Sequence, residues 1–591
     1  MKIIFFAPFS GIWVHSFAEA LIAESLAQNG HEIVYISCGR LYSKLCNVMR
    51  CYNFNFSTDI NKKNKICHLC ENSNDIIIKN FKFKNFNLAG KLQPQDVEYA
   101  KKITSGVTNA NYLSLVIDGI EIGRIALYEV LLRFKKTQLT KFSEEEWSEY
   151  IAELEHALLT YSIMKRVFAQ EKPDRLILHN ALYSVNHICC ELARKFGIID
   201  YESYATGNLF RRYERLTIGR GGRINVNRYC LDHWEKYKEI PASMEYLQIA
   251  VSHQLELFKG TNAFAYSPSK SAQPLNIREI FKISDSQKIF VAVMSSYDEI
   301  FAAQTIGLEQ TKRAPVFESQ VDWIKALIEY FSPRPELFLV IRVHPREFPN
   351  KREGVKSEHA SILEKIFNDL PSNITVNWPG QNISLYEFAE YTNVFLCAWS
   401  SVAKEMTLLG IPVVTYFIEF LCYPADLTYV GNSKPDYFDK LEKALCEGWS
   451  IEHARKTLRW MVLEYCYSAF TVADSFNMYN EKKSKIIILI FKIMSKIFNY
   501  NFLHVSDCKT RAPRLLAGNI LNKLIVSEKN SILDVLEPSD IKLVTKEEET
   551  KAIKILFKQI LEALYTEKIN SNENSLNYKL HSFVNDKNIG S

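Results

Sequence analysis

The feature that most constrains the fold of this chain is the alternation of short apolar runs with helical segments, which starts at the first residues. Residues 2–7 are apolar apart from Lys2 and predict a buried strand, and residues 31–38 predict a second strand. Between them, residues 16–29 have a helical pattern that Asn29-Gly30 closes. Two consecutive strands joined by a helix run parallel, so this start predicts an α/β protein with a doubly wound parallel sheet.

The same alternation returns later in the sequence. After a helical stretch from about 93 to 170, residues 174–180 predict a further strand, and residues 260–274 have the Ser, Pro and Gly content of a linker. A second α/β series follows the linker, and its strands and helices are expected at 288–294, 320–331, 337–344, 374–379, 384–391, 394–398, 401–410 and 411–417.

The length of 591 residues is too great for one compact core, so several domains are expected. We predict two Rossmann-like domains facing a cleft, at residues 1–265 and 275–475. The first would contain the helical insert at 93–170 and a Cys-rich loop at 38–70, and residues 476–591 would form a basic helical extension with a frayed tail. In such folds ligands bind at the carboxyl ends of the strands, beside the cleft.

The composition excludes several classes of protein. A net charge of +5 does not indicate a nucleic-acid groove, so no nucleic-acid partner is expected. No run of 18 or more apolar residues is present, so no membrane-spanning helix is predicted. The apolar start is short and broken by Pro8, which disfavours a signal peptide and favours a cytoplasmic location. The 13 cysteines then fit reduced thiols or metal ligands better than a disulfide framework.

Two polar clusters follow strands of the second series. The strand at 337–344 ends in Arg342, His344, Pro345 and Arg346, whose side chains are suited to phosphate or base edges, or to capping the strand end among solvated charges. Next to the strand at 394–398, the segment 400–405 opens a helix with two serines, a pattern that predicts a phosphate cradle or simple capping.

Within that segment, Ser400 and Ser401 would hold phosphate, and Glu405 would accept ribose hydroxyls because a cap at Ser401 does not use it. Ser295 follows the strand at 288–294 and is a further, weaker candidate for a diphosphate contact. The neighbouring Ser296 and Glu299 fit a capping box.

The first domain offers polar groups at three places. Where the strand at 174–180 ends lie side chains that can hydrogen-bond sugar hydroxyls or, equally, satisfy a helix start: His179, Asn180, Tyr183 and Asn186. His15 stands in the first strand-to-helix loop. Asp118 lies in a stretch that reads as a helix, where the default interpretation is a solvated face.

Four cysteines have a spacing like that of a small zinc ribbon: Cys46, Cys51, Cys67 and Cys70. They would hold a structural Zn²⁺ in a long loop, with Cys38 and His68 as alternative ligands, or remain free thiols. Separately, residues 482–498 are basic and apolar. They are too short to span a bilayer and would lie at a membrane surface or pack against the second domain.

The residues collected above resemble a known family. Over residues 1–475 the chain is similar to GT-B glycosyltransferases of capsular and surface polysaccharide synthesis, through "FAPFSGIWVHSFAEALIAESLAQNGHEI", "GRIALYE", "NALYSVN", "SSYDEIFAA", "RVHPREFPNKRE" and "AWSSVAKEMTLLGIPVVTY". The His-Pro and Ser-Ser pairs resemble those of bacterial transferases that use CMP-activated acidic sugars. By that resemblance His344 and Pro345 contact the nucleotide, and Ser400 and Ser401 its phosphate.

The resemblance implies an inverting, metal-independent transferase that needs no cofactor and acts on a surface-polysaccharide or lipid-linked glycan acceptor. The acidic-acidic-Gly motif of the CMP-sugar enzymes is replaced by Ile117-Asp118-Gly119, so a UDP- or GDP-linked donor stays open beside CMP. His15, placed like the base of plant and antibiotic glycosyltransferases, is the first candidate base and Asp118 the second. A sugar-nucleotide 2-epimerase of the same fold and a non-catalytic scaffold of a polysaccharide assembly complex are the alternatives.

Overall fold

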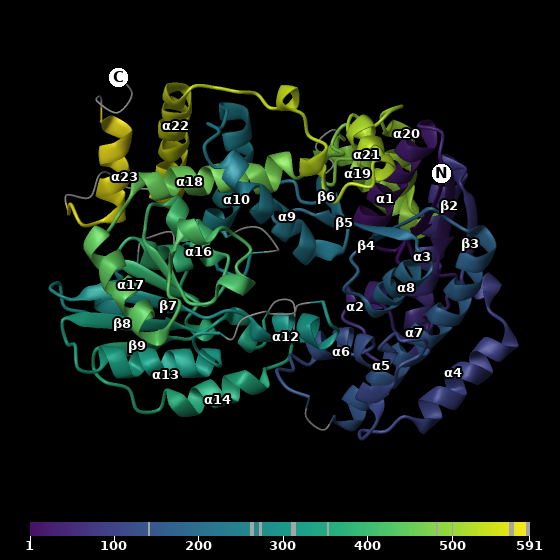
Figure 1. Cartoon of the computed structure of the whole chain (residues 1–591), viewed down its shortest axis with the longest axis horizontal. Helices are drawn as coiled ribbons and strands as arrows, with labels where there is room; N and C mark the ends of the chain where they lie inside the picture. The colour runs from purple at the N-terminus through teal and green to yellow at the C-terminus, as the bar shows by residue number, and fades with distance from the viewer. Residues whose placement is uncertain are drawn as a thin grey trace.

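The computed structural model describes residues 1–139, 142–260, 265–270, 275–308, 315–350, 354–479, 483–498, 500–565 and 572–586. The expected linker at 260–274, the basic Lys482 and the last residues of the tail fall partly or wholly outside this described part. Within it, two separate β-sheets and the helices around them form the body of the molecule (Figure 1).

The first sheet has seven strands in the order β13-β6-β5-β4-β1-β2-β3. Their bounds are β1 Lys2–Phe6, β2 Glu32–Ser37, β3 Lys84–Asn87, β4 Arg175–His179, β5 Ile199–Ala205, β6 Arg215–Gly219 and β13 Phe470–Thr471. Strands β3, β2, β1, β4 and β5 are parallel, whereas β6 and β13 add antiparallel edges. Since β1 is apolar on both faces, helices can cover both sides of this sheet.

The helices of the first half confirm the predicted β-α-β start, and the stretch from 93 to 170 is mainly helical. They are α1 Trp13–Gln28, α2 Asn47–Arg50, α3 Ile60–Phe81, α4 Pro94–Gly106, α5 Ile122–Ile125, α6 Tyr128–Arg133, α7 Glu144–Glu171 and α8 Ser184–Lys195. Two expectations are wrong. The Cys-rich segment at 38–70 is not one loop but contains α2 and the first turns of α3, and Asp118 lies in a turn with φ of 50° instead of a helix.

The second sheet has six parallel strands in the order β12-β11-β10-β7-β8-β9. The strands are β7 Lys288–Val293, β8 Leu337–Arg342, β9 Ile374–Asn377, β10 Val394–Cys397, β11 Val413–Thr415 and β12 Tyr429–Val430. The helices of this half are α11 Ile277–Ile280, α12 Tyr297–Thr305, α13 Gln320–Phe331, α14 Glu358–Ile366, α15 Leu385–Ala389, α16 Val402–Leu408, α17 Lys434–Glu447 and α18 Ile451–Val462.

Two connections tie the halves together. Helices α9 (Gly222–Tyr237) and α10 (Met244–Lys259) precede the expected boundary at residue 265 but contribute to the hydrophobic core around β7, β8 and β10. After α18, a π-helical turn and β13 carry the chain back to the edge of the first sheet. Two Rossmann-like domains exchanged in this way form a GT-B arrangement, so the predicted fold class is confirmed (Figure 1).

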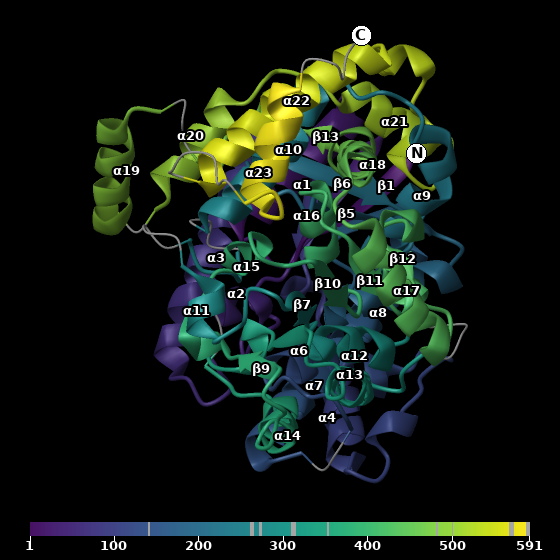
Figure 2. The ribbon, with the colours of Figure 1, turned by 90° about the vertical axis from the view of Figure 1, so that its left-hand side faces the viewer.

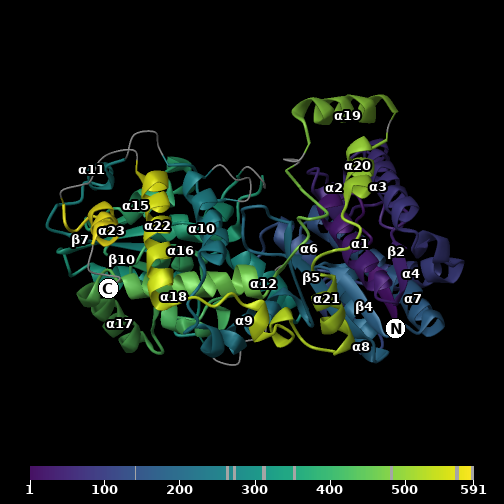
Figure 3. The same cartoon turned by 90° about the horizontal axis from the view of Figure 1, so that it is seen from above.

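The C-terminal extension consists of α19 Lys485–Phe498, α20 Phe502–Thr510, α21 Gly518–Val526, α22 Lys546–Leu564 and α23 Leu576–Asn585. It packs on both domains. On the first, Arg511 of α20's end forms a bidentate ion pair with Glu24 at 2.8 and 2.6 Å. On the second, Arg459 of α18 forms one with the buried Glu549 of α22 at 2.9 and 2.6 Å. The extension therefore packs against both domains on the same side of the molecule (Figure 3).

Candidate functional site

His15 lies in the first turn of α1, just beyond the carboxyl end of β1. Its imidazole stacks on that of His179, the last residue of β4, with ring centroids 4.0 Å apart. Because β1 and β4 are neighbours in the parallel sheet, their carboxyl ends meet at one edge and bring the two histidines together. The predicted base and one predicted acceptor-binding residue thus share a site.

Both imidazoles are neutral near pH 7. Burial, with His179 and Arg212 nearby, holds the pKa of His15 well below its ordinary value, and burial lowers the pKa of His179 to about 4. Two phenol rings frame the pair, with Tyr213 5.1 Å from His15 and Tyr204 5.6 Å from His179 between centroids. A neutral imidazole with a free lone pair is the protonation state a general base requires.

The polar residues after β4 hold the loop that carries His179. Asn180, with φ of 62°, accepts hydrogen bonds from the Leu182 N–H at 3.0 Å and the Tyr204 hydroxyl at 2.6 Å. Asn186 donates to the carbonyls of His179 and Asn180 at 2.6 and 3.1 Å. Tyr183 precedes α8 and packs edge-on against Phe9. The asparagines therefore position the histidine, in addition to any contact with an acceptor.

Three buried carboxyls around the end of β4 and the loop that follows it were missed from the sequence: Glu19, Glu129 and Glu202. Burial raises their pKa values to about 8, 7 and 8 respectively. Glu129 accepts from the Ser184 N–H and Glu202 from the Ala181 N–H, both at 3.0 Å, and among the described residues each of the three has one oxygen without a hydrogen-bond partner. Glu19 follows His15 by one helical turn, a spacing that signals a shared helix face.

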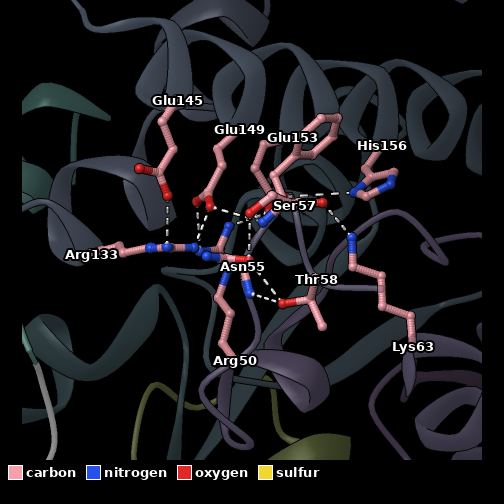
Figure 4. A network of polar contacts seen from close by, with 11 residues as sticks. Arg50, Asn55, Ser57, Thr58, Lys63, Arg133, Glu145, Glu149, Glu153 and His156 are labelled. Atoms are coloured by element: carbon pink, nitrogen blue, oxygen red, sulfur yellow. Dashed lines mark hydrogen bonds and ion pairs between the residues drawn. The ribbon is translucent and has the colours of Figure 1, made fainter. Parts of the chain in front are cut away.

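An ion network joins α2, α6 and α7 in the first domain (Figure 4). Arg50 of α2 donates to Glu149 at 3.2 Å and to Glu153 at 2.7 Å, and both carboxylates project from α7. Arg133 of α6 joins the same Glu149. Burial is the main reason that the pKa of Glu129 is raised; the nearby Glu153 charge raises it further and Arg50 lowers it.

The His-Pro element lies where β8 ends in the second domain. His344 caps a 3-10 turn formed by Pro345–Glu347, and its Nδ1 accepts the Arg346 N–H at 3.2 Å. Its ring contacts Tyr266 edge-on at 5.2 Å, and burial lowers its pKa to about 4. Nε2 of this neutral ring is the atom left for a nucleotide contact.

The two arginines of this element have internal partners, contrary to the expectation of a phosphate contact. Arg342 is buried under the sheet edge, bonded to Asn377 and to the Ile383 carbonyl. Arg346 bridges the domains, because its guanidinium donates to Asp298 at 2.8 Å and to the Leu132 carbonyl of α6 at 3.1 Å. These two guanidinium groups therefore form internal contacts that hold the loop after β8 and the domain interface in place.

The serines of the second domain remain accessible to a ligand to different degrees. Ser401 is exposed and makes no side-chain cap bond, whereas the Ser400 hydroxyl accepts the Val402 N–H at 3.3 Å. Glu405 is buried and accepts the Tyr386 hydroxyl at 2.8 Å, so it is not free for ribose as expected.

The loop after β7 carries Ser295 and Ser296. The Ser295 hydroxyl is buried and has no partner among the described residues. The expected capping box of Ser296 and Glu299 does not form, because the Ser296 hydroxyl donates to Asp298 instead.

A further ion pair joins α16 to the π-helical turn. Lys404 of α16 donates to Glu464 of the π-helical turn at 2.6 Å, and both side chains are nearly buried. Burial lowers the pKa of His253 to about 3, with smaller contributions from Lys404 and Arg212, and Arg212 also lowers the pKa values of His15 and His179.

The remaining two predictions fail on geometry. Asp118 is half exposed, bonded to Lys165 at 2.5 Å and to Tyr161, and lies near Lys195 at the end of α8 opposite His179. It is not beside His15.

The four cysteines Cys46, Cys51, Cys67 and Cys70 do not form a metal site either, since no group of three or more potential ligands is so arranged in the described residues. Cys51 is exposed, and the Cys70 thiol accepts the Gly11 N–H at 3.2 Å. Burial raises the pKa values of Cys46 and Cys70 to about 12, which keeps these thiols protonated. Cys46, Cys67 and Cys70 line a cavity of about 290 Å³ between the carboxyl ends of β1 and β2 and helix α3.

Comparison with known proteins finds only solved structures of low sequence identity and low TM-score. No protein-family model matches the chain, and no curated protein matches it. Among solved structures, UDP-GlcNAc 2-epimerase of Methanocaldococcus jannaschii, in complex with UDP-GlcNAc and UDP, is 13% identical, with 78% of this chain and 98% of that chain covered and a TM-score of 0.26. KpsC of Thermosulfurimonas dismutans, a beta Kdo 2,4 transferase, is 12% identical over 51% and 82%, with a TM-score of 0.31. The spinosyn rhamnosyltransferase SpnG is 12% identical over 79% and 96%, with a TM-score of 0.23. At these levels the matches carry no argument about substrate or site.

Proposed function

We propose that the chain is a glycosyltransferase that moves a sugar from a nucleotide-sugar donor to a surface-polysaccharide or lipid-linked glycan acceptor. The observation that carries the proposal is the stacked pair of neutral imidazoles, His15 and His179, at the carboxyl ends of β1 and β4 in a GT-B arrangement. A neutral base at this edge can take a proton from an acceptor hydroxyl bound in the first domain.

The donor would bind the second domain. His344 and Pro345 would contact the nucleotide, and the hydroxyls of Ser295, Ser400 and Ser401 would donate to its phosphates. The CMP, UDP and GDP forms all fit this assignment. His179, Asn180, Tyr183 and Asn186 would line the acceptor side, with the asparagines also holding the loop.

The reaction would invert the anomeric carbon in one displacement. The acceptor oxygen forms a bond to that carbon as its proton passes to His15, and the bond from the carbon to the phosphate oxygen breaks. The departing nucleotide keeps the electron pair, and its growing negative charge is offset by the serine hydroxyls. These groups belong to the chain itself, so the proposed step is metal-independent and needs no cofactor.

A second candidate is a sugar-nucleotide 2-epimerase, which the three buried carboxyls favour. Glu19, Glu129 and Glu202 have pKa values raised to about 7 or 8, the range in which a carboxyl can both donate and accept a proton near neutral pH. Removing a proton from a sugar carbon and returning it on the other face needs two such groups. No acceptor would be involved.

One experiment separates these functions and the scaffold alternative. The protein is incubated with CMP-, UDP- and GDP-linked sugars, first alone and then with a lipid-linked glycan, and nucleotide release and donor isomerisation are followed. Acceptor-dependent nucleotide release supports the transferase, and an isomerised donor without acceptor supports the epimerase. No binding of any donor leaves a non-catalytic scaffold and rejects both enzymes.

A further inference from the structure

Helix α19 presents an apolar surface that no other part of the described chain covers. None of its residues is buried, and Ile486 and Ile497 are 70% and 69% exposed. Ile486, Ile490, Ile493 and Ile497 recur every three or four residues and so share one helix face. A continuous row of exposed isoleucines is unfavourable in water and marks an interaction surface.

The opposite side of the same helix explains its orientation. Phe491, Met494 and Ser495 are partly covered, and the Ser495 hydroxyl accepts the N–H of Phe502, the first residue of α20. Phe498 also packs edge-on against Phe502. This attachment turns the isoleucine face away from the body, and the helix stands off the molecule (Figures 2 and 3).

The charges on α19 select the partner. Lys485, Lys492 and Lys496 lie on one stripe beside the isoleucine face, and the helix contains no acidic residue. At 14 residues it is too short to cross a bilayer, and no helix in the described ranges is long and apolar enough to do so. An apolar face flanked by lysines fits the boundary between acyl chains and anionic headgroups, where the ammonium groups reach the phosphates.

Helix α19 lies on the side of the first domain that carries α2 and α3, as Figures 2 and 3 both show. Helix α3 also borders the cavity beside β1 and β2. A protein docked through α19 would therefore bring this part of the first domain near the membrane.

We infer that α19 docks the protein on an anionic phospholipid bilayer, lying in the headgroup region with its isoleucines inserted and its lysines on the phosphates. The docking does not depend on the proposed transferase activity. Together with that function, it names the acceptor class as a lipid-linked glycan presented at the membrane surface.

The test uses the full chain and vesicles without any nucleotide sugar, so its result is independent of catalysis. Flotation is measured with vesicles of phosphatidylcholine alone and of equal parts phosphatidylcholine and phosphatidylglycerol. We expect binding to the anionic vesicles only, weakened by salt. The triple variant Ile486→Ser/Ile490→Ser/Ile493→Ser should bind about 100-fold more weakly, and Lys485→Gln/Lys492→Gln/Lys496→Gln at least about 10-fold more weakly.

The matched control replaces exposed apolar residues elsewhere, Leu516→Ser/Leu543→Ser/Ile555→Ser, and should bind like the wild type. Melting temperatures check that all variants fold. Absence of vesicle binding by the wild type, or equal binding by the serine triple variant, overturns the proposal. So does a wild-type dimer in light scattering that the serine variant dissociates, because α19 would then join two copies of the chain.

Discussion

The imidazole rings of His15 and His179 stack with their centroids 4.0 Å apart, although 164 residues separate them in the sequence. Trp13, two residues before His15, is fixed from the other side by the extension. Its indole stacks on His504 and donates to Asp507 at 2.9 Å. The start of α1, and with it the candidate base, is thus held by the first sheet and by a segment near the end of the chain.

Replacing His15 by Ala should remove the base and leave the donor site intact. We expect kcat for sugar transfer to fall by about 100- to 10,000-fold while the dissociation constant for the donor changes little. Steady-state kinetics and calorimetric donor titration measure the two quantities. His581→Ala, on the remote α23, is the control. Unchanged turnover of the His15 variant would eliminate the assignment.

The pH profile of the reaction should lack a limb at the ordinary imidazole pKa. Burial lowers the pKa of His179 to about 4 and holds that of His15 well below its ordinary value, so neither ring takes up a proton as pH falls from 8 to 6.5. We expect kcat/KM to show no loss from histidine protonation over this range. A profile that declines with an apparent pKa of 6.5 or above would contradict the buried, neutral pair.

Ser401→Ala should weaken donor binding without affecting stability. The Ser401 side chain is exposed and makes no capping bond, so the folded state loses nothing when it is removed. A lost hydrogen bond to a phosphate corresponds to a roughly 10-fold higher donor dissociation constant. Titration with the donor and a thermal melt give the two readouts, and a variant with wild-type affinity would place the phosphate elsewhere.

Arg346→Ala should act on stability, in contrast to the serine variant. Removing the guanidinium leaves the buried Asp298 carboxyl without its ion pair and frees the Leu132 carbonyl of the other domain. Loss of one partner of a buried pair costs about 3 kcal/mol or more of unfolding free energy. Denaturant unfolding measures it, with the exposed Arg124→Ala as control. A stable variant with reduced donor affinity would instead restore Arg346 to the nucleotide site.

Glu202→Gln should change how stability depends on pH. Burial raises the pKa of Glu202 to about 8 in the folded protein, while the unfolded chain keeps an ordinary carboxyl pKa near 4.5. Between these values the folded state holds a proton that the unfolded state lacks, so this contribution is complete below pH 4.5 and is lost as pH rises to 8. The slope is at most about 1.4 kcal/mol per pH unit.

The neutral amide of the glutamine variant has no such linkage. Unfolding free energies measured from pH 5 to pH 8 should therefore fall less steeply with pH for Glu202→Gln than for the wild type. The exposed Glu235→Gln serves as control, since its side chain is 78% exposed. Parallel curves for Glu202→Gln and wild type would show that Glu202 is ionised throughout.

The tertiary structure corrected those site predictions in which a polar residue type was taken as evidence of a ligand. Arg342 and Arg346 follow a strand as a phosphate site would require, yet their guanidinium groups turn to Asn377 and Asp298. Cys46 and Cys51 flank the short helix α2, whereas Cys67 and Cys70 lie in α3. Spacing along the chain specifies neither a rotamer nor a partner.

The sequence by itself determined the α/β class and most of its strands, because a strand buried on both faces must be apolar and each connecting helix must carry a 3.6-residue period. It also placed His15 and His179 after strands, and parallel strands bring such positions to one edge. Only the tertiary structure decided that these rings stack, that Glu19, Glu129 and Glu202 are buried, and that the extension contacts both domains. Those features depend on contacts between residues distant in sequence, which local periodicity does not encode.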